Sequence, residues 1–405
     1  MTEPTYRGVE GDEELAELAR VLNEGFGLSG DEELRRDWIA DQPQEELRQV
    51  RARRTRGAGD EMVATLTRIP MGHYLGGRPV TSVGIAAVAV PALRRGEGHA
   101  RRLMRAALEE AHEEGFALST LYASTYRLYR SVGFERAGTA AVLQVTPERL
   151  QGIEPLEDAD DTRVLELTPD DEADARALYE SYAPRHDGYA VRSSEGLWWR
   201  ATFPRRIRSE GALVLEGDRP TGYARWIRTK GPGYRYELHV SDMAATTAAA
   251  ARRIVSVLRD HGTIGETTHW GTGPGDPLAA LLPGPRFDVV GRDDWMVRVV
   301  DVTAALEQRG YASDVAARLE FAVDDPDFDA NAGQFTLDVE DGRGTVRRGG
   351  SGTLRVTARA LAPLVTGFAT ARQLALTGGV EGNETSLATA GALFASSGPW
   401  MVDRF

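Results

Sequence analysis

The chain contains no cysteine among its 405 residues. This absence excludes disulfide bonds, thiolate metal sites and a cysteine nucleophile. Long apolar stretches are missing as well, because no run reaches the roughly 18 apolar residues that a membrane-spanning helix needs. The N-terminal segment is acidic, whereas a secretory signal begins with basic residues followed by an apolar stretch. Together these absences predict a cytoplasmic protein that has no membrane partner.

Positive charge is in deficit, since 48 basic residues stand against 61 acidic ones and the net charge is −13. This balance argues against nucleic acid as a partner, because phosphate backbones attract basic surfaces. A negative field suits a cationic substrate such as an amine, although it equally serves solubility alone. The histidines show no metal-ligand spacing, so no metal is predicted. They are His73, His99, His112, His186, His239, His261 and His269.

The length exceeds that of one ordinary domain and predicts two or three. Apolar periodicity predicts a first helix over Asp12–Gly27 and a second helical segment over Asp31–Ile39. Two strands, Glu61–Tyr74 and Pro79–Val90, are joined by a glycine-containing hairpin turn. A further strand over Ala137–Val145 closes this part of the chain.

The most informative stretch runs from Thr81 to Gly138. Its strand ends at Pro91, which cannot donate to a sheet ladder, and a turn with two glycines leads into a helix. The N–H groups of such a turn lack internal partners, and the helix dipole favours negative charge there. Glycine admits a phosphate close to the backbone, and Arg94 and Arg95 add positive charge. The stretch predicts a phosphate site, although a basic turn at a helix start shows the same features.

This stretch resembles the GNAT acetyltransferases in three segments that follow in the family's order. Residues 95–100, RGEGHA, fit the pyrophosphate-loop pattern R-x-x-G-x-A, and residues 88–90, VAV, are the strand end before it. Residues 128–134, LYRSVGF, are similar to the family's Y-x-x-x-G-F segment. The resemblance implies that acetyl-CoA binds here. The implied contacts are Val88, Ala89, Val90, Arg95, Gly96, Glu97, Gly98, His99, Ala100, Arg101, Ser124 and Thr125.

The same order of elements returns after an acidic, turn-rich linker at Gln151–Asp161. The expected strands are Val164–Leu167, Gly211–Glu216, Gly222–Thr229 and Tyr234–Val240, and the expected helices are Asp170–Tyr182 and Ala244–His261. After Val240, however, neither arginine nor glycine occupies the place of the phosphate loop, and Asp242 would repel a pyrophosphate. The second copy is therefore predicted not to bind coenzyme A.

The last part of the chain places most of its strands before its helices. Strands are expected over Trp295–Val302, Val315–Val323, Gly333–Val339 and Gly344–Arg347, and helices over Thr303–Arg309, Ala358–Thr366, Thr370–Thr377 and Thr385–Phe394. This order indicates a small α+β domain. It resembles the sterol carrier protein fold.

As a whole, the chain resembles the Eis (enhanced intracellular survival) family of bacterial N-acetyltransferases. The resemblance implies an α+β (α/β) fold with two tandem GNAT-like domains, residues 1–147 and 148–300, and a sterol-carrier-like domain, residues 301–405. It also implies acetyl transfer to primary amines, including those of aminoglycosides and lysine side chains, and assembly into homo-oligomers, commonly hexamers. By position, Tyr129 corresponds to the family's general acid, and the terminal carboxylate of Phe405 to its base.

Acyl transfer to an amine gives each of these residues a chemical role. A backbone N–H near Val90 can stabilise the thioester oxyanion. Tyr129, with an ordinary pKa of about 10, stays protonated at neutral pH and can help the thiolate leave; its alternative role is packing against the cofactor. The Phe405 carboxylate, with an ordinary pKa of about 3.3 to 3.7, is a weak base. It can instead orient the cationic amine while water carries the proton, and Asp403 is the next candidate for that steering.

Two other functions compete with this hypothesis. A binding protein could carry an apolar ligand in its C-terminal domain, but a buried chain end without an apolar cavity in residues 301–405 would argue against it. A catalytically silent regulatory homologue is disfavoured by the intact phosphate loop and Tyr129. Trp400 and Phe405 predict a packed chain end, the alternative being a frayed tail. Phe26 and Trp38 are candidates for an acceptor pocket or for core packing.

Overall fold

The computed structural model describes residues 3–27, 43–54, 59–153, 161–202, 208–284 and 287–405. The helical segment expected over 31–39, with Trp38, and most of the predicted linker at 151–161 lie outside these residues. None of the helices in the described ranges combines the length and the apolar character needed to cross a bilayer.

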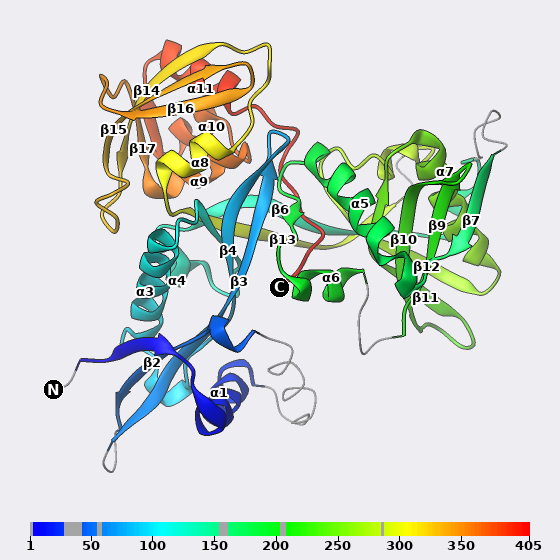
Figure 1. Ribbon diagram of the computed structural model, residues 1–405, viewed down its shortest axis with the longest axis horizontal. Helices are drawn as coiled ribbons and strands as arrows, with labels where there is room; N and C mark the ends of the chain where they lie inside the picture. The colour runs from blue at the N-terminus through cyan, green and yellow to red at the C-terminus, as the bar shows by residue number, and fades with distance from the viewer. Residues whose placement is uncertain (1–2, 28–42, 55–58, 154–160, 203–207, 285–286) are drawn as a thin grey trace.

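The first GNAT-like part follows the order expected from the sequence (Figure 1). Its strands are β1 (Thr5–Gly8), β2 (Leu47–Arg53), β3 (Asp60–Leu75), β4 (Arg78–Ala89), β5 (Leu118–Tyr122) and β6 (Glu135–Val145), and its helices are α1 (Gly11–Phe26), α3 (His99–Glu113) and α4 (Tyr126–Arg130). Helix α3 buries its apolar face, which includes Leu103, Met104 and Leu108, against the sheet. This burial fixes the helix start beside the end of β4.

The second part repeats this layout around a second long helix. Its strands are β7 (Thr162–Glu166), β8 (Ala190–Val191), β9 (Glu210–Glu216), β10 (Arg219–Lys230), β11 (Tyr236–Ala245), β12 (Gly265–Thr272) and β13 (Asp288–Val299), and its helices are α5 (Glu172–Tyr182), α6 (Glu195–Ala201) and α7 (Ala248–Asp260). Strand β11 runs beyond the predicted end at Val240, and α7 begins later than the predicted Ala244. Residues 242–245 stay extended because they pair with β10, although alanine favours helix.

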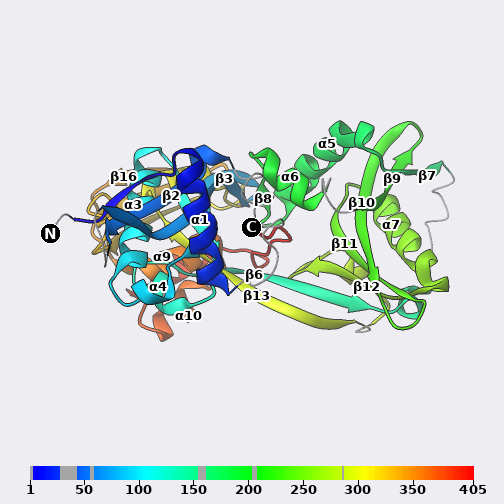
Figure 2. The same ribbon diagram turned by 90° about the horizontal axis from the view of Figure 1, so that it is seen from below.

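The two parts exchange strands within one sheet. The sheet runs in the order β1-β2-β3-β4-β5-β13-β6-β12-β11-β10-β9-β7. Strand β13 pairs antiparallel with β5 and with β6, and β6 pairs with β12 (Figure 2). Strand β8 of the second part also joins this sheet by pairing with β3. The first half of the sheet thus contains β13 and β8 from the second part of the sequence, and the second half contains β6 from the first part. A boundary at residues 147 and 148 divides the chain but not the sheet, and these domain limits stay a prediction.

The C-terminal unit is an α+β layer of its own. Its sheet has the order β16-β15-β14-β17-β18. The elements are α8 (Val302–Gln308), β14 (Ala317–Asp324), β15 (Gly333–Glu340), β16 (Arg343–Arg348), β17 (Leu354–Thr357), α9 (Ala358–Thr366), α10 (Ala371–Leu376), β18 (Val380–Gly382) and α11 (Glu384–Leu393). Its hydrophobic core is continuous with that of the first GNAT-like part, here called the first unit. One guanidinium nitrogen, Nη2, of the buried Arg298 in β13 donates to both carboxylate oxygens of Asp325, at 2.6 and 2.7 Å.

The chain end is packed, which contradicts the alternative of a frayed tail. After α11 the chain leaves the C-terminal unit and runs between the two halves of the large sheet (Figures 1 and 2). The Met401 N–H donates to the carbonyl of Thr139 at 3.0 Å, and Trp400 is only 2% exposed. Because the C-terminal unit packs on the first unit, the residues that follow α11 lie in the middle of the molecule.

One buried histidine makes the fold sensitive to acid. His73 in β3 stacks on Trp295 with ring centroids 4.9 Å apart, and its Nδ1–H donates to the carbonyl of Gly188 at 3.1 Å. Burial lowers its pKa to about 4. In the unfolded chain the same pKa is about 6.5, so the unfolded state binds more protons between these values and stability falls as the pH falls.

We therefore expect His73→Phe, which keeps a stacking ring but cannot titrate, to lose less stability between pH 7 and pH 5 than the parent chain. The difference should be about 2 kcal/mol of unfolding free energy, since each pKa unit corresponds to about 1.4 kcal/mol. Urea titrations at the two pH values measure it. Equal losses in both proteins would show that His73 is not the source of the acid sensitivity.

Candidate active site

The sheet opens between β4 and β5. The two parallel strands pair only from Ser82–Leu118 to Gly84–Thr120, although β4 continues to Ala89 and β5 to Tyr122. Beyond Gly84 the strands form a fork, which we call the first fork. Strand β4 also carries a bulge against β3, where Ala87 adopts a positive φ of 53°. Strained residues and bulges of this kind gather at functional sites, where they turn backbone groups away from the ladder.

A glycine turn connects the end of β4 to helix α3. Gly96 and Gly98 have positive φ values of 86° and 83°, and a Cβ built at either residue would meet no atom within 4 Å. Gly98 is the residue before the first helical turn, and it offers no side chain to cap the N–H groups of α3. The turn is therefore an open cradle of backbone donors at a helix N-terminus, which fits a pyrophosphate group.

The charges around this turn differ from the expectation. Arg94 does not add free positive charge, because its guanidinium forms ion pairs with Glu61 and Glu97. The Arg94 hydrogen bonds lower the pKa of Glu97, and the resulting carboxylate also contacts Nε2 of the buried His99 at 3.0 Å. The Glu97 side chain is thus unsuited to bind phosphate. The exposed Arg95 donates to the carbonyl of Val90 at 3.3 Å and supports the turn from below.

The remaining predicted cofactor residues border the turn and the first fork. Val88 and Val90 at the end of β4 are half-buried, whereas Ala89 between them is buried. At the start of α3, Ala100 is half-buried and Arg101 is exposed. Ser124 and Thr125 are exposed in the short connection from β5 to α4.

Tyr129 lies in α4 with its ring buried. The side chain is 5% exposed, and its ring packs edge-on against Phe134 with centroids 6.1 Å apart. Burial raises the pKa of Tyr129 to about 12. The hydroxyl therefore remains protonated at neutral pH, as a hydrogen-bond donor must. At this pKa it is a weak acid, and its contribution is to hydrogen-bond a departing thiolate more than to surrender the proton beforehand.

Phe405 lies at the base of the first fork. Its ring packs against Tyr122 with centroids 5.5 Å apart, and a Cβ on Gly84 would lie 3.0 Å from the Phe405 ring. The Tyr122 hydroxyl donates to the carbonyl of Asp403 at 2.8 Å, which ties the last residues to β5.

The two predicted catalytic residues occupy opposite faces of the sheet. Tyr129 shares a hydrophobic cluster with Leu121, whereas Phe405 packs in another cluster with Tyr122. Leu121 and Tyr122 are consecutive in β5, and consecutive strand residues point to opposite faces. A group lying in the first fork would thus have the tyrosine on one side and the chain end on the other.

Sequence reasoning missed the residues that anchor the chain end. Arg192 is fully buried and donates to both oxygens of Asp242, at 2.7 and 2.9 Å, and from Nε to Asp403 at 2.9 Å. Its guanidinium also lies 3.8 Å from the ring centroid of Tyr179. Asp242 is therefore a compensated charge inside β11, which corrects its predicted place in a loop that repels phosphate. Asp403 is engaged in the same network and is not free to steer a substrate.

The second unit has a similar fork, but the chain itself fills it. Strands β11 and β12 pair in parallel up to His239–His269 and then separate, which forms the second fork. The tail lies there, with Val402 2.8 Å from the position of a Cβ on Gly271. Helix α7 also begins differently from α3, since the Thr247 hydroxyl accepts from the Ala250 N–H at 3.1 Å and caps it.

Known proteins match this organisation. Residues 5–137 and 188–299 each match the acetyltransferase (GNAT) domain, and residues 302–402 match the sterol carrier protein domain. An uncharacterized N-acetyltransferase of Streptomyces griseus is 30% identical over 97% of both chains, and the N-acetyltransferase Eis of Mycobacterium tuberculosis is 28% identical over 71% of both. The chain belongs to the Eis-like family of GNAT N-acetyltransferases.

A solved structure supports the same conclusion for the Eis-like fold. The crystal structure of a GCN5-related N-acetyltransferase from Anabaena variabilis is 29% identical and aligns over 100% of both chains with a TM-score of 0.90. The predicted family, the fold class and the acetyltransferase activity are thereby confirmed. The GNAT domains of this Eis-like enzyme imply the use of acetyl-CoA, and the first of them contains the glycine turn and the first fork.

Proposed function

We propose that this enzyme transfers the acetyl group of acetyl-CoA directly to a primary amine within the first fork. The observation that carries the proposal is the placement of Tyr129 and Phe405 on opposite faces of the separated strands. Direct transfer needs a proton donor on the side of the departing sulfur and a negative group on the side of the arriving amine. Tyr129 and Phe405 lie on these two sides of the sheet, so neither side chain has to reach through it.

In the proposed reaction, the neutral amine nitrogen attacks the thioester carbonyl, the C–N bond forms and the C–S bond breaks. A backbone N–H at the end of β4, near Val90, stabilises the oxyanion. The Phe405 carboxylate orients the incoming ammonium ion, which loses one proton through water to this carboxylate before the neutral nitrogen attacks. After the C–N bond has formed, a second proton passes from nitrogen through water to the thiolate, to which Tyr129 donates a hydrogen bond. The glycine turn holds the pyrophosphate with its backbone N–H groups.

The acceptor is proposed to be a small cationic amine, such as an aminoglycoside, or a lysine side chain. The net charge of −13 supports a cation. At the end of α1, Phe26 is 49% exposed, so its core-packing alternative is wrong. The adjoining Gly25 lies so close to Ala89 of β4 that an added Cβ would be 2.7 Å from the Ala89 Cβ, so this end of α1 packs on β4. Phe26 is therefore our candidate for the acceptor pocket.

A coenzyme A release assay across a panel of amines tests the proposal. We expect release to depend on a primary amine among aminoglycosides and lysine peptides, and to be lost when the same amines are dimethylated. Protein with acetyl-CoA alone sets the background of hydrolysis. If no primary amine raises release above that background, direct transfer to amines is wrong.

We expect one coenzyme A site per chain, in the first unit only. Gly98→Glu should abolish binding, because it places a carboxylate at the helix N-terminus and forces a side chain into a positive φ. Gly115→Glu is a matched control, since Gly115 has a φ of 82° and equally open surroundings at the far end of α3. Titration calorimetry measures both. Two equivalent sites in the parent chain would contradict the proposal that the second fork is closed.

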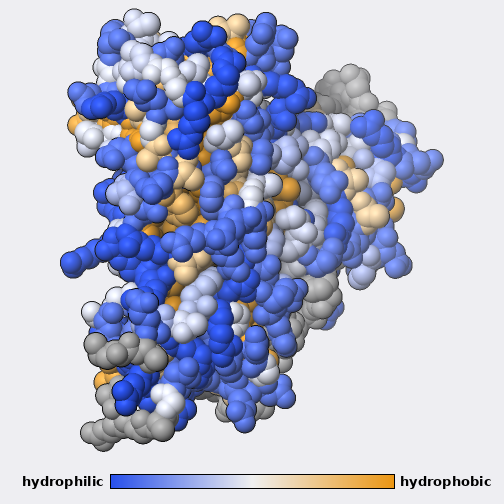
Figure 3. Space-filling model, turned by 60° about the vertical axis from the view of Figure 1, so that its left-hand side comes forward, coloured by the Kyte–Doolittle hydropathy of each residue, from blue (hydrophilic) through white to orange (hydrophobic). Residues whose placement is uncertain are grey.

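Self-association is proposed as well. On the side of the molecule shown in Figure 3, several exposed hydrophobic residues lie among hydrophilic ones, most of them in the upper and middle parts of the view. Exposed apolar surface of this kind marks interaction sites. Together with the family resemblance it supports a homo-oligomer, for which the hexamer is our expectation and light scattering the measurement.

The alternative function, carriage of an apolar ligand by the C-terminal unit, is not favoured. One cavity of about 480 Å³ at α9 and α10 is bordered by Arg130, Glu135 and Arg359. Another of about 490 Å³ is bordered by Arg355 and Glu381. The lining of the first cavity also includes the apolar Pro363, Phe368 and Leu374. In both cavities, however, an apolar ligand would bury charged side chains, which costs free energy.

A further inference from the structure

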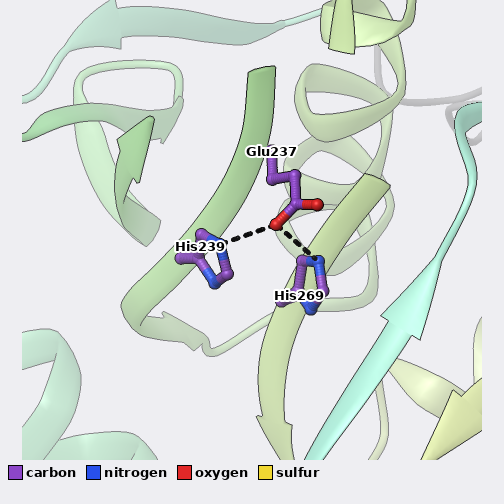
Figure 4. Close-up of side chains that lie close together, drawn as sticks. All are labelled: Glu237, His239 and His269. Atoms are coloured by element: carbon purple, nitrogen blue, oxygen red, sulfur yellow. Dashed lines mark ion pairs between the residues drawn. The ribbon is translucent and has the colours of Figure 1, made fainter. Parts of the chain in front are cut away.

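Two histidines and a glutamate gather on one face of the second unit. His239 of β11 lies directly opposite His269 of β12 in the parallel register, and Glu237 lies two residues before His239 on the same face. The alternate residues, such as Leu238 and Trp270, point the other way into the core under α7. Figure 4 shows the three polar side chains converging.

Their ligand atoms are close to the spacing that a metal ion requires. Oε2 of Glu237 lies 3.5 Å from Nε2 of His239 and 3.9 Å from Nε2 of His269 (Figure 4). The imidazole rings stack with centroids 4.4 Å apart, and one ligand atom from each residue lies within 4.8 Å of the others. Bonds of about 2.0 to 2.2 Å to a tetrahedral ion put ligand atoms about 3.3 Å apart. Because the rings are stacked, their nitrogen lone pairs run side by side, and the imidazoles must turn about their side-chain bonds to bind one ion.

The proposed ligand atom of His269 already takes part in a hydrogen bond. The Thr267 hydroxyl lies 2.8 Å from Nε2 of His269, and rotation of this hydroxyl frees the nitrogen for an ion. Two imidazoles and a carboxylate together suit a dication.

We propose that Glu237, His239 and His269 bind one first-row transition-metal dication of the Zn²⁺ class. Two imidazole nitrogens favour Zn²⁺, Ni²⁺ or Cu²⁺ over Mg²⁺ and Ca²⁺, which prefer oxygen ligands. Three protein ligands leave at least one coordination position for water or a small ligand. Both histidines border a cavity of about 270 Å³ that the chain end also lines, from which such a ligand can reach the ion.

The histidine spacing did not indicate this site, because its ligands come from two strands that are brought together only by the parallel register. Binding would link β11 to β12 just before the second fork opens. The proposal is independent of acetyl transfer, since none of the three ligands belongs to the first fork.

Calorimetric titration of untagged, EDTA-treated and dialysed protein with ZnCl₂, without acetyl-CoA, tests the proposal. We expect one site per chain. His239→Gln and His269→Gln should each weaken it at least about tenfold, a loss that changes outside the ligand shell already cause. His261→Gln is the matched control, because this histidine of the same unit contacts the Tyr236 hydroxyl at 2.9 Å and lies outside the Glu237–His239–His269 cluster, so the variant should bind as the parent does.

A second readout identifies the donors directly. Cu²⁺ bound to the parent chain should show electron paramagnetic resonance couplings to two imidazole nitrogens, and each histidine variant should show one fewer. Circular dichroism without metal confirms that the partly exposed substitutions leave the fold intact. The proposal is overturned if the parent binds no Zn²⁺, if MgCl₂ competes equally well, or if the His239→Gln/His269→Gln double variant keeps the parent's affinity and stoichiometry.

Discussion

Replacing Tyr129 by phenylalanine is expected to lower kcat by about 100- to 10,000-fold, the usual contribution of general acid catalysis. The affinity for acetyl-CoA should stay close to that of the parent, because only the hydroxyl is lost and the ring keeps its contact with Phe134. Steady-state kinetics with a fixed amine and calorimetry with coenzyme A separate the two effects. Thermal melting verifies that the buried ring still packs.

The matched control is Tyr126→Phe, one turn earlier in α4, where the side chain is 38% exposed. It should retain parental kcat. If Tyr129→Phe also turns over within about twofold of the parent, its hydroxyl is not the proton donor and Tyr129 has the packing role that the sequence left open.

A short glycine–serine tail added after Phe405 is expected to reduce amine acetylation by about 100-fold or more. Small misplacements of a reacting group already cost about that much, and the tail moves the terminal charge away from the first fork. Acetyl-CoA affinity and the melting temperature should change little, because the glycine turn and the Arg192–Asp403 ion pair are untouched. The same tail before Met1 is the control.

A C-terminal amide made by semisynthesis refines the test, because it removes the charge while the Phe405 ring keeps its contact with Tyr122. Deleting Phe405 removes the ring and moves the terminal carboxylate back by one residue. It should therefore reduce amine acetylation at least as much as the amide does. Equal turnover of the two tagged proteins would show that the terminal carboxylate takes no part. Asp403 could not replace it, since its buried carboxylate already accepts from Nε of Arg192 at 2.9 Å.

The sequence predicted the ends of an element correctly where residues at those ends fix them. Helix α9 begins after the Thr357 cap and ends at Gly367, with a φ of 75°, so its residues 358–366 agree with the prediction. Strand β12 was missed, because its small and polar residues are held extended by β6 and β11 on either side. The predicted helix wrongly included Ala244 and Ala245. Their pairing with β10 outweighs the helix propensity of alanine and keeps both residues in a strand.

Some residues of the candidate site could likewise be predicted from a local sequence pattern, and others could not. The glycine turn is a contiguous motif, so its residues could be read from the sequence. The pairing of Arg192 with Asp242 and Asp403 joins residues 50 and 211 positions apart, and no local pattern encodes such a contact. The opposite placement of Tyr129 and Phe405 depends on how the C-terminal unit docks, which only the folded chain reveals.

The exchange of strands has a consequence for folding during synthesis. The Thr120 hydroxyl of β5 donates to the carbonyl of Met296, 176 residues later in the chain. While the ribosome makes the intervening residues, β5 and β6 lack the strand that separates them, and open strand edges invite misassociation. The nascent first unit therefore has no complete sheet to fold into until β13 has emerged. Protection of these edges by a chaperone, or slow translation past residue 299, would favour the native arrangement.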